Sequence, residues 1–132
     1  MGRKLKVLIA EDERALARVI ERNLVARGHS AICVDTAEAA ILQMIEEWPD
    51  AVILDVNLPD YSAWEILRRL SGRSRDNLRV VVISAAPISQ KRIDEFKPDS
   101  ALQKPFPLSA LLHAIEGDAE DLGTENERSL LS

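Results

Sequence analysis

The chain has 132 residues, of which 46% are hydrophobic, and a formal net charge of −5. This length and apolar content fit a single domain whose core needs no disulfide or structural metal, and the acidic balance argues against nucleic acid or an anionic membrane as a partner. No apolar run approaches the roughly 18 residues of a membrane span, and the run near the N-terminus is too short for a signal peptide. We therefore expect a cytoplasmic protein in which Cys33 is a reduced, inert core residue.

Residues 5–10 predict a first strand, and residues 13–27 predict the helix that follows it. The apolar residues of this helix recur at helical spacing and share one face: Leu16, Val19, Ile20 and Leu24. Gly28 is placed to end the helix, and residues 31–34 predict a short second strand.

Thr36 is a suitable N-cap for a second helix, which ends before Pro49. Its apolar face is formed by four residues: Ala40, Ile41, Met44 and Ile45. Residues 51–54 predict a third strand, an apolar run that stops at the carboxylate of Asp55. Because burying an unpaired carboxylate costs several kcal/mol, Asp55 needs either an open strand end or a partner.

Ser62 and Glu65 have the spacing of a capping box, which predicts the start of a third helix, and Gly72 ends it. Residues 78–83 form a near-continuous apolar run, typical of a strand covered on both faces.

The C-terminal part of the chain continues the alternation with weaker patterns. Residues 87–97 favour only a weak or shortened fourth helix, and residues 101–102 predict a short fifth strand. Pro107 can open a fifth helix. We expect one domain at residues 4–117 and an acidic, disordered tail at residues 118–132.

Strands that alternate with helices predict an α/β fold, a doubly wound five-stranded parallel sheet with helices on both faces. Ligands of such sheets bind beyond the carboxyl ends of the strands. Five polar residues follow strand ends here: Glu11, Asp12, Asp55, Ser84 and Lys104. Each alone is commonly a cap, a turn residue or a surface charge, but together they bring carboxylates, a hydroxyl and an ammonium to one edge.

Clustered carboxylates repel each other, by about 4 kcal/mol at about 4 Å for an effective dielectric constant of about 20. Mg²⁺ relieves this repulsion and prefers oxygen ligands. Zinc is disfavoured because His29, His113 and Cys33 do not follow strand ends. A metal beside a carboxylate nucleophile, with a hydroxyl and an ammonium for anionic oxygens, is suited to phosphoryl transfer.

Four segments, VLIAEDE, ILDVNLP, ISA and KPF, occur in an order and spacing that resembles the receiver domain of bacterial two-component response regulators. The resemblance covers about residues 4–117. It implies the flavodoxin-like strand order 2-1-3-4-5. Because few residues follow the last helix, we expect a single-domain regulator without a DNA-binding output domain, with a piece cut from a longer protein as the alternative.

The resemblance implies a metal site and a phosphoryl acceptor. Asp55 would accept a phosphoryl group from a phosphohistidine of a histidine kinase or phosphotransfer protein. Asp12 would bind Mg²⁺ directly, Glu11 mainly through water, and Asn57 through its backbone carbonyl, with Asp55 also a ligand. Mn²⁺ can substitute for Mg²⁺.

The remaining site residues would act on the phosphoryl group and the switch. Ser84 and Lys104 would each bind a phosphoryl oxygen, and the peptide bond before Pro105 would be cis. The protein would not be an enzyme beyond its own phosphorylation and dephosphorylation. It would signal by a conformational switch to a downstream protein target, alone or as a homodimer.

The sequence departs from the family where the switch is expected. Ala101 occupies the position at which the family usually carries Tyr or Phe, and the segment between Ser84 and Lys104 is about two residues shorter than usual. We therefore expect the signal to rearrange or order residues 85–98. The switch region comprises Ala85, Ala86, Pro87 and Ala101.

Two other functions remain open from the sequence. One is a pseudo-receiver, an interaction module that is never phosphorylated, although the complete set of five polar residues argues against it. The other is a haloacid-dehalogenase-like phosphatase, which would need a second aspartate where the chain has Asn57.

Overall fold

The computed structural model describes residues 3–72 and 75–117, in which strands and helices alternate. The strands of this part are β1 (Lys6–Ala10), β2 (Ser30–Val34), β3 (Ala51–Asp55), β4 (Arg79–Ser84) and β5 (Ser100–Gln103). The helices are α1 (Arg14–Ala26), α2 (Ala37–Glu46), α3 (Ala63–Arg69), α4 (Gln90–Phe96) and α5 (Leu108–Glu116). The predicted order of elements is confirmed, and their boundaries shift by no more than a few residues.

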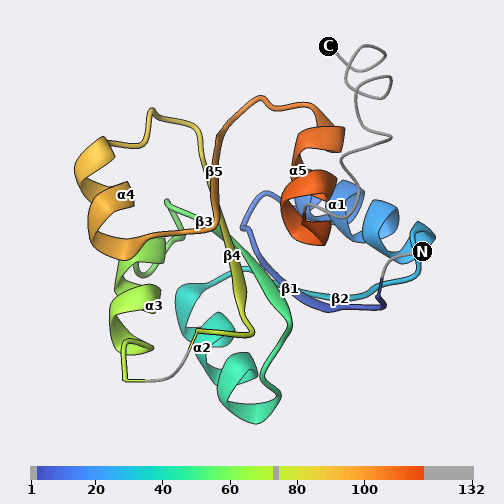
Figure 1. Cartoon of the computed structure of the whole chain (residues 1–132), viewed down its shortest axis with the longest axis horizontal. Coiled ribbons are helices and arrows are strands. Elements are labelled where there is room, and N and C mark those ends of the chain that lie inside the picture. The colour runs from blue at the N-terminus through green and yellow to red at the C-terminus, as the bar shows by residue number, and fades with distance from the viewer. Residues whose placement is uncertain (1–2, 73–74, 118–132) are drawn as a thin grey trace.

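The strands form one parallel sheet in the order β2-β1-β3-β4-β5. Helices α1 and α5 cover one face, while α2, α3 and α4 lie on the other (Figure 1). The predicted doubly wound sheet and its strand order are confirmed. The order reverses between β1 and β3, which is where folds of this kind place a ligand.

The central strand β3 contributes to both apolar layers, since all its residues are buried. Val52 and Leu54 pack with α2 and α3, and Ala51 and Ile53 pack with α1 and α5. The continuous apolar run that predicted this strand therefore reflects burial on both faces.

Two residues predicted on inner helix faces lie at the surface. Val19 on α1 is 46% exposed and Ile45 on α2 is 63% exposed. Each helix contacts the sheet along one side only, so its buried arc is narrower than its apolar face. Apolar spacing thus predicted the helices correctly and overestimated their core-facing surface.

Cys33 is exposed, so its assignment to the core is wrong. It lies on β2, an edge strand of the sheet whose residues are mostly exposed or half-buried. Its Sγ lies 3.7 Å from the carbonyl oxygen of Ala17 on α1. Partial desolvation is the main cause that raises the pKa of the thiol to about 11, and the nearby charge of Glu21 adds to it. The thiol therefore stays protonated.

Side chains and a glycine fix the helix ends as the sequence predicts. The Oγ1 of Thr36 accepts the N–H of Ala39 at 3.0 Å, and the Oγ of Ser62 accepts the N–H of Glu65 at 3.3 Å. Gly28 follows α1 with φ of 95°, a conformation that favours glycine.

Helix α4 is short, as expected, and has no fully buried residue. No helix in the described ranges is long and apolar enough to cross a bilayer. The tail expected at residues 118–132 lies outside the described residues.

An ionic cluster joins the end of α5 to the end of α1, beyond the amino ends of the strands. The carboxylate of Glu116 accepts hydrogen bonds from Arg27 at 2.6 and 2.7 Å and lies 2.9 Å from His29 Nε2. His29 is buried, and its Nδ1 accepts the N–H of Leu5. Burial raises the pKa of Glu116, but the bonds from Arg27 and His29 outweigh it and bring the pKa below its ordinary value of 4.5.

We expect Glu116→Gln to lower the free energy of unfolding by about 1–3 kcal/mol at pH 7, because it removes the charged acceptor of a buried imidazole. The folded-state pKa of Glu116 is depressed, so its contribution is complete above pH 4.5 and is lost as the pH falls through the folded-state value. Urea unfolding across this range measures the effect, with the exposed Glu46→Gln as the control. Equal stability of variant and wild type at pH 7 would contradict the assignment.

Candidate functional site

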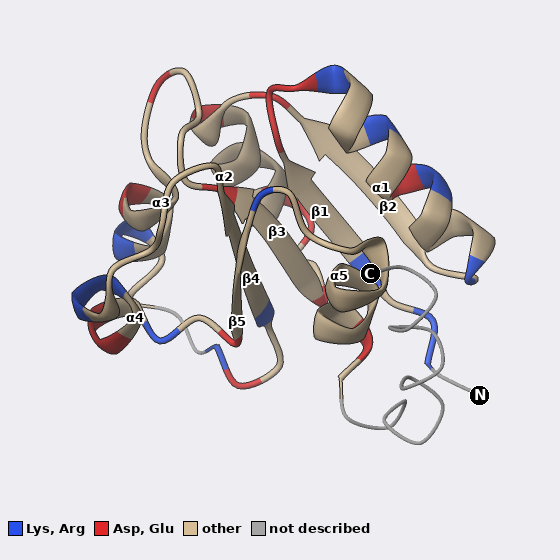
Figure 2. Ribbon diagram, turned by 90° about the horizontal axis from the view of Figure 1, so that it is seen from above, with Lys and Arg blue, Asp and Glu red and all other residues tan. Residues whose placement is uncertain are grey.

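The sheet register brings the predicted polar residues to one edge. Ala10 pairs with Leu54, so the residues that follow them, Glu11 and Asp55, lie at the same level. Asp55 in turn pairs with Ile83, directly before Ser84. Figure 2 shows acidic ribbon segments after β1 and at the end of β3, with a basic segment after β5 at the same end of the sheet.

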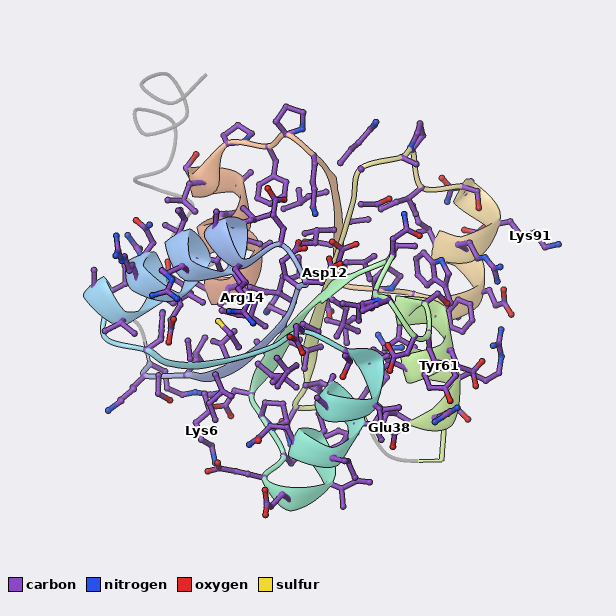
Figure 3. All side chains as sticks on the ribbon, turned by 180° about the vertical axis from the view of Figure 1, so that it is seen from behind. Lys6, Asp12, Arg14, Glu38, Tyr61 and Lys91 are labelled. Atoms are coloured by element: carbon purple, nitrogen blue, oxygen red, sulfur yellow. The ribbon has the colours of Figure 1, made fainter. Side chains whose placement is uncertain are left out.

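Three carboxylates meet at this edge. One oxygen from each of Glu11, Asp12 and Asp55 lies within 4.8 Å of the others. Glu11 and Asp55 are buried, with 2% and 4% exposure, whereas Asp12 is exposed and lies near the middle of the molecule in Figure 3. The cluster is therefore open to solvent on the Asp12 side.

The ammonium of Lys104 lies between the two buried carboxylates and offsets part of their charge. Its Nζ lies 2.8 Å from Glu11 Oε1 and 2.8 Å from Asp55 Oδ2. Burial alone would lower the pKa of Lys104, but the hydrogen bond to Asp55 and the ion pair with Glu11 outweigh burial and raise it. The lysine therefore stays cationic between the two acids.

Glu11 carries the largest resolved perturbation among the described carboxyl groups. Its Oε2 accepts the N–H of Glu13 at 3.0 Å, and its Oε1 contacts Lys104 as an ion pair without the alignment of a hydrogen bond. Desolvation is the main cause that raises its pKa to about 7, against the lowering effect of Lys104. The carboxyl group is thus poised to lose its proton near neutral pH when a stronger cation approaches.

The loop between β3 and α3 folds back on Asp55. The N–H of Asn57 donates to Asp55 Oδ1 at 2.8 Å, and Asn57 forms an isolated antiparallel bridge with Ser62. Leu58 is buried against the core. Both carboxylate oxygens of Asp55 are therefore held, Oδ1 by the loop and Oδ2 by Lys104.

Ser84 is buried at the end of β4, and its Oγ accepts the N–H of Ala86 at 3.1 Å. Its backbone oxygen accepts the N–H of Lys104 at 2.7 Å, which ties the two strand ends together. The peptide bond between Lys104 and Pro105 is cis.

The residues predicted for the switch lie in the segment that follows β4 and on β5. Ala85, Ala86 and Pro87 are exposed, while Ala101 is half-buried and pairs with Val82.

The donor set fits a hard divalent cation. All three side chains that converge offer carboxylate oxygens, and the described residues contain no His or Cys in the cluster. Such oxygens suit Mg²⁺ and Mn²⁺ rather than zinc. The residues present therefore fit Mg²⁺, the metal that the sequence predicts.

A family model described as the response regulator receiver domain matches residues 7–116. The chain belongs to the response regulator receiver domain family. Receiver domains are signalling modules of two-component systems, and they bind Mg²⁺ at an acidic pocket and interact with histidine kinases or phosphotransfer proteins. The receiver assignment made from the four sequence segments is confirmed.

Curated relatives align with this receiver domain over most of its length. The sensory/regulatory protein RpfC of Xanthomonas campestris is 31% identical over 86% of the chain, and the response regulator FleR of Pseudomonas aeruginosa is 33% identical over 83%. The transcriptional regulatory protein KdpE of Mycobacterium tuberculosis is 33% identical over 80%. The chain spans only 16%, 24% and 47% of these three relatives, respectively.

Solved structures show the same fold. A CheY-like receiver domain from Methylobacillus flagellatus is 27% identical with a TM-score of 0.73, covering 86% of this chain and all of the other. The response regulator TrrA from Thermotoga maritima, solved in complex with Mg²⁺-BeF, is 19% identical with a TM-score of 0.75, covering 86% of this chain and 96% of the other.

Asp60 was given no role by the sequence. Its carboxylate accepts backbone N–H groups at the start of α2, including that of Ala37, which is 23 residues earlier in the chain. No local pattern marks such a contact, although a second acid five residues after Asp55 was visible in the sequence.

In metal-free buffer with chelator, we expect Glu11→Gln to stabilise the fold at pH 8, on the order of 2 kcal/mol. The folded-state pKa of Glu11 is raised, so the wild type loses stability as the pH rises from about 4.5 to about 7, and the variant escapes this loss. Denaturant unfolding at pH 5 and pH 8 measures the difference, with the exposed Glu13→Gln as the control. A wild type whose advantage over the variant grows with pH would contradict the raised pKa.

Proposed function

We propose that this receiver domain accepts a phosphoryl group on Asp55 from the phosphohistidine of a histidine kinase or phosphotransfer protein. The observation that carries the proposal is the buried Asp55 carboxylate, which lies within 4.8 Å of two other carboxylates and 2.8 Å from Lys104. Clustered buried acids are costly and are concentrated at functional sites. This cluster therefore indicates a site for a cation and an anionic ligand.

Glu11, Asp12, Asp55 and the backbone carbonyl of Asn57 would hold Mg²⁺. When bound, Mg²⁺ supplies charge neutralisation for the transferring phosphoryl group. Glu11 would act mainly through water, and because its pKa is raised to about 7 it would have to be ionised to face the metal.

The transfer itself is a displacement at phosphorus. A carboxylate oxygen of Asp55 forms a bond to phosphorus as the phosphorus–nitrogen bond of the phosphohistidine breaks, and the electron pair of that bond returns to the imidazole. The product is an acyl phosphate. Lys104, which already contacts Oδ2, stays beside the new oxygens and offsets their charge.

Ser84 connects this chemistry to the surface. Its hydroxyl accepts the N–H of Ala86 in the present state. A hydroxyl that turns to donate to a phosphoryl oxygen gives up the geometry of that bond, so the exposed segment after β4 loses an anchor. The proposed signal thus begins at Ala86.

Helix α4 is the element best placed to respond. It has no fully buried residue and is held mainly at its end, where the ring of Phe96 stacks on Trp64 of α3 at 5.3 Å between centroids. Arg75 donates to the backbone oxygens of Phe96 and Lys97 at 2.7 and 3.0 Å. Lys91 on the outer side of α4 points away from the body of the protein (Figure 3). We propose that residues 85–98 carry the switch in place of an aromatic residue at Ala101.

The domain unit that performs this reaction is proposed as residues 4–117, acting on a downstream protein, alone or as a homodimer. The pseudo-receiver alternative predicts the same fold without phosphorylation. The phosphatase alternative would need an acid at position 57, where the chain has the amide side chain of Asn57.

We expect the chain to be labelled by radioactive acetyl phosphate in the presence of Mg²⁺, and Asp55→Asn to abolish the label. The matched control is Asp35→Asn, which changes an exposed acid just after β2. Absence of label in the wild type would support the pseudo-receiver alternative. Release of free phosphate at many turnovers per minute would support the phosphatase alternative.

We expect Mg²⁺ with beryllofluoride, a phosphoryl mimic, to change amide exchange within residues 85–98. The N–H of Ala86 should respond first, because Ser84 is its acceptor. Hydrogen exchange of the wild type with and without the mimic measures this, and Asp55→Asn under identical conditions should show no response. A wild type whose 85–98 amides exchange at unchanged rates while the label test succeeds would place the switch elsewhere.

A further inference from the structure

The carboxylate of Asp60 binds the start of helix α2. Its Oδ1 accepts the N–H of Ala37 at 2.8 Å and that of Tyr61 at 2.9 Å, and its Oδ2 accepts the N–H of Glu38 at 2.9 Å. Ala37 and Glu38 are the first two residues of α2, whose N–H groups have no partner within the helix. A carboxylate from the phosphoacceptor loop therefore satisfies donors of a helix that lies earlier in the chain.

Helix α2 also has a local cap, because Thr36 Oγ1 accepts the N–H of Ala39. Both caps accept N–H groups of the first turn of α2, but they connect this turn to different parts of the chain. Thr36 joins α2 to its own preceding residue, whereas Asp60 joins α2 to the loop between β3 and α3. Removing either one exposes backbone donors of α2, and only the removal of Asp60 frees the loop.

Neighbouring contacts strengthen the same junction. The guanidinium of Arg69 on α3 lies 4.4 Å from the centroid of the Tyr61 ring and 3.6 Å from the carboxylate of Glu38. Glu38 on α2 and Tyr61 in the loop before α3 are labelled on the same side of the molecule in Figure 3. These contacts are exposed and individually weak. The hydrogen bonds of Asp60 are thus the main tie between the loop tip and α2.

Backbone contacts close the base of the loop, where Asn57 bridges to Ser62, but few contacts hold its tip. Leu58 is buried, but Pro59, Asp60 and Tyr61 are all exposed. Without the Asp60 carboxylate, the loop would keep the Asn57–Ser62 bridge and the burial of Leu58, but its tip would be free to sample other conformations. Asn57, whose N–H binds Asp55 Oδ1, lies only three residues before Asp60.

We infer that Asp60 is a positioning residue for the metal site: it anchors the loop tip to α2 and so holds the Asn57 backbone in place beside Asp55. This role rests on the proposed function, since it concerns the Mg²⁺ that Asn57 would help to hold. Preorganisation of this kind removes an ordering cost that the loop would otherwise meet when the metal binds. Burial raises the pKa of Asp60, but its backbone hydrogen bonds outweigh burial and lower the pKa, so the anchor is ionised at neutral pH.

The test compares three variants of the full chain by backbone amide NMR: Asp60→Ala, Asp60→Asn and Thr36→Ala. Asp60→Ala and Thr36→Ala each remove one side-chain cap from the same helix end and should lower the melting temperature to a similar extent.

In a Mg²⁺ titration, we expect Asp60→Ala to weaken the affinity for Mg²⁺ by about tenfold, as removal of supporting groups around metal ligands does. Thr36→Ala should bind within about twofold of the wild type, and Asp60→Asn, which keeps one acceptor, should fall between.

A second readout needs no metal. In metal-free protein, the amide of Asn57 should exchange faster in Asp60→Ala than in Thr36→Ala. Equal Mg²⁺ affinity and equal Asn57 exchange in these two variants would overturn the positioning role and leave the proposed function standing. A wild type that binds no Mg²⁺ would instead overturn the proposed function, and with it the role of Asp60 toward the metal.

Discussion

The ammonium of Lys104 lies 2.8 Å from carboxylate oxygens of both Glu11 and Asp55, and the functional edge of the sheet depends on this contact. Three ionised carboxylates within 4.8 Å of one another repel, and a cation beside them offsets that repulsion. Lys104 supplies one positive charge from the strand end after β5. One ammonium cannot balance three ionised carboxylates, and this excess of negative charge favours a divalent ion.

The same contact links the chemistry to the rest of the fold. Lys104 is held to β4 through the bond from its N–H to the oxygen of Ser84, and Ser84 in turn holds Ala86. A change at Asp55 can therefore reach the surface through two adjacent strand ends, without the aromatic residue that Ala101 replaces. On the other side of Asp55, the loop tip is fastened to α2 by Asp60. The site thus lies between one anchored loop and one loosely held helix.

The alternation of strands and helices predicted the parallel sheet, and the resemblance to receiver domains implied its strand order. Because parallel strands bring their carboxyl ends to one edge, the sequence also predicted that Glu11, Asp12, Asp55 and Lys104 meet there, with Ser84 at the neighbouring strand end. It failed where burial depends on neighbours that a periodic pattern does not reveal. Cys33 lies on an edge strand, and Val19 and Ile45 lie outside the contact arcs of their helices. Asp60 escaped notice because its acceptor role joins segments more than 20 residues apart. The perturbed pKa of Glu11 likewise arises from burial that no local motif encodes.

The central claim, that Glu11, Asp12 and Asp55 form one cation site, is tested most directly by crystals soaked with Mn²⁺ and measured at a wavelength where manganese scatters anomalously. We predict one strong anomalous peak bordered by the three carboxylates, with Lys104 retained beside Asp55. A peak elsewhere on the protein, or none at millimolar Mn²⁺, would contradict it.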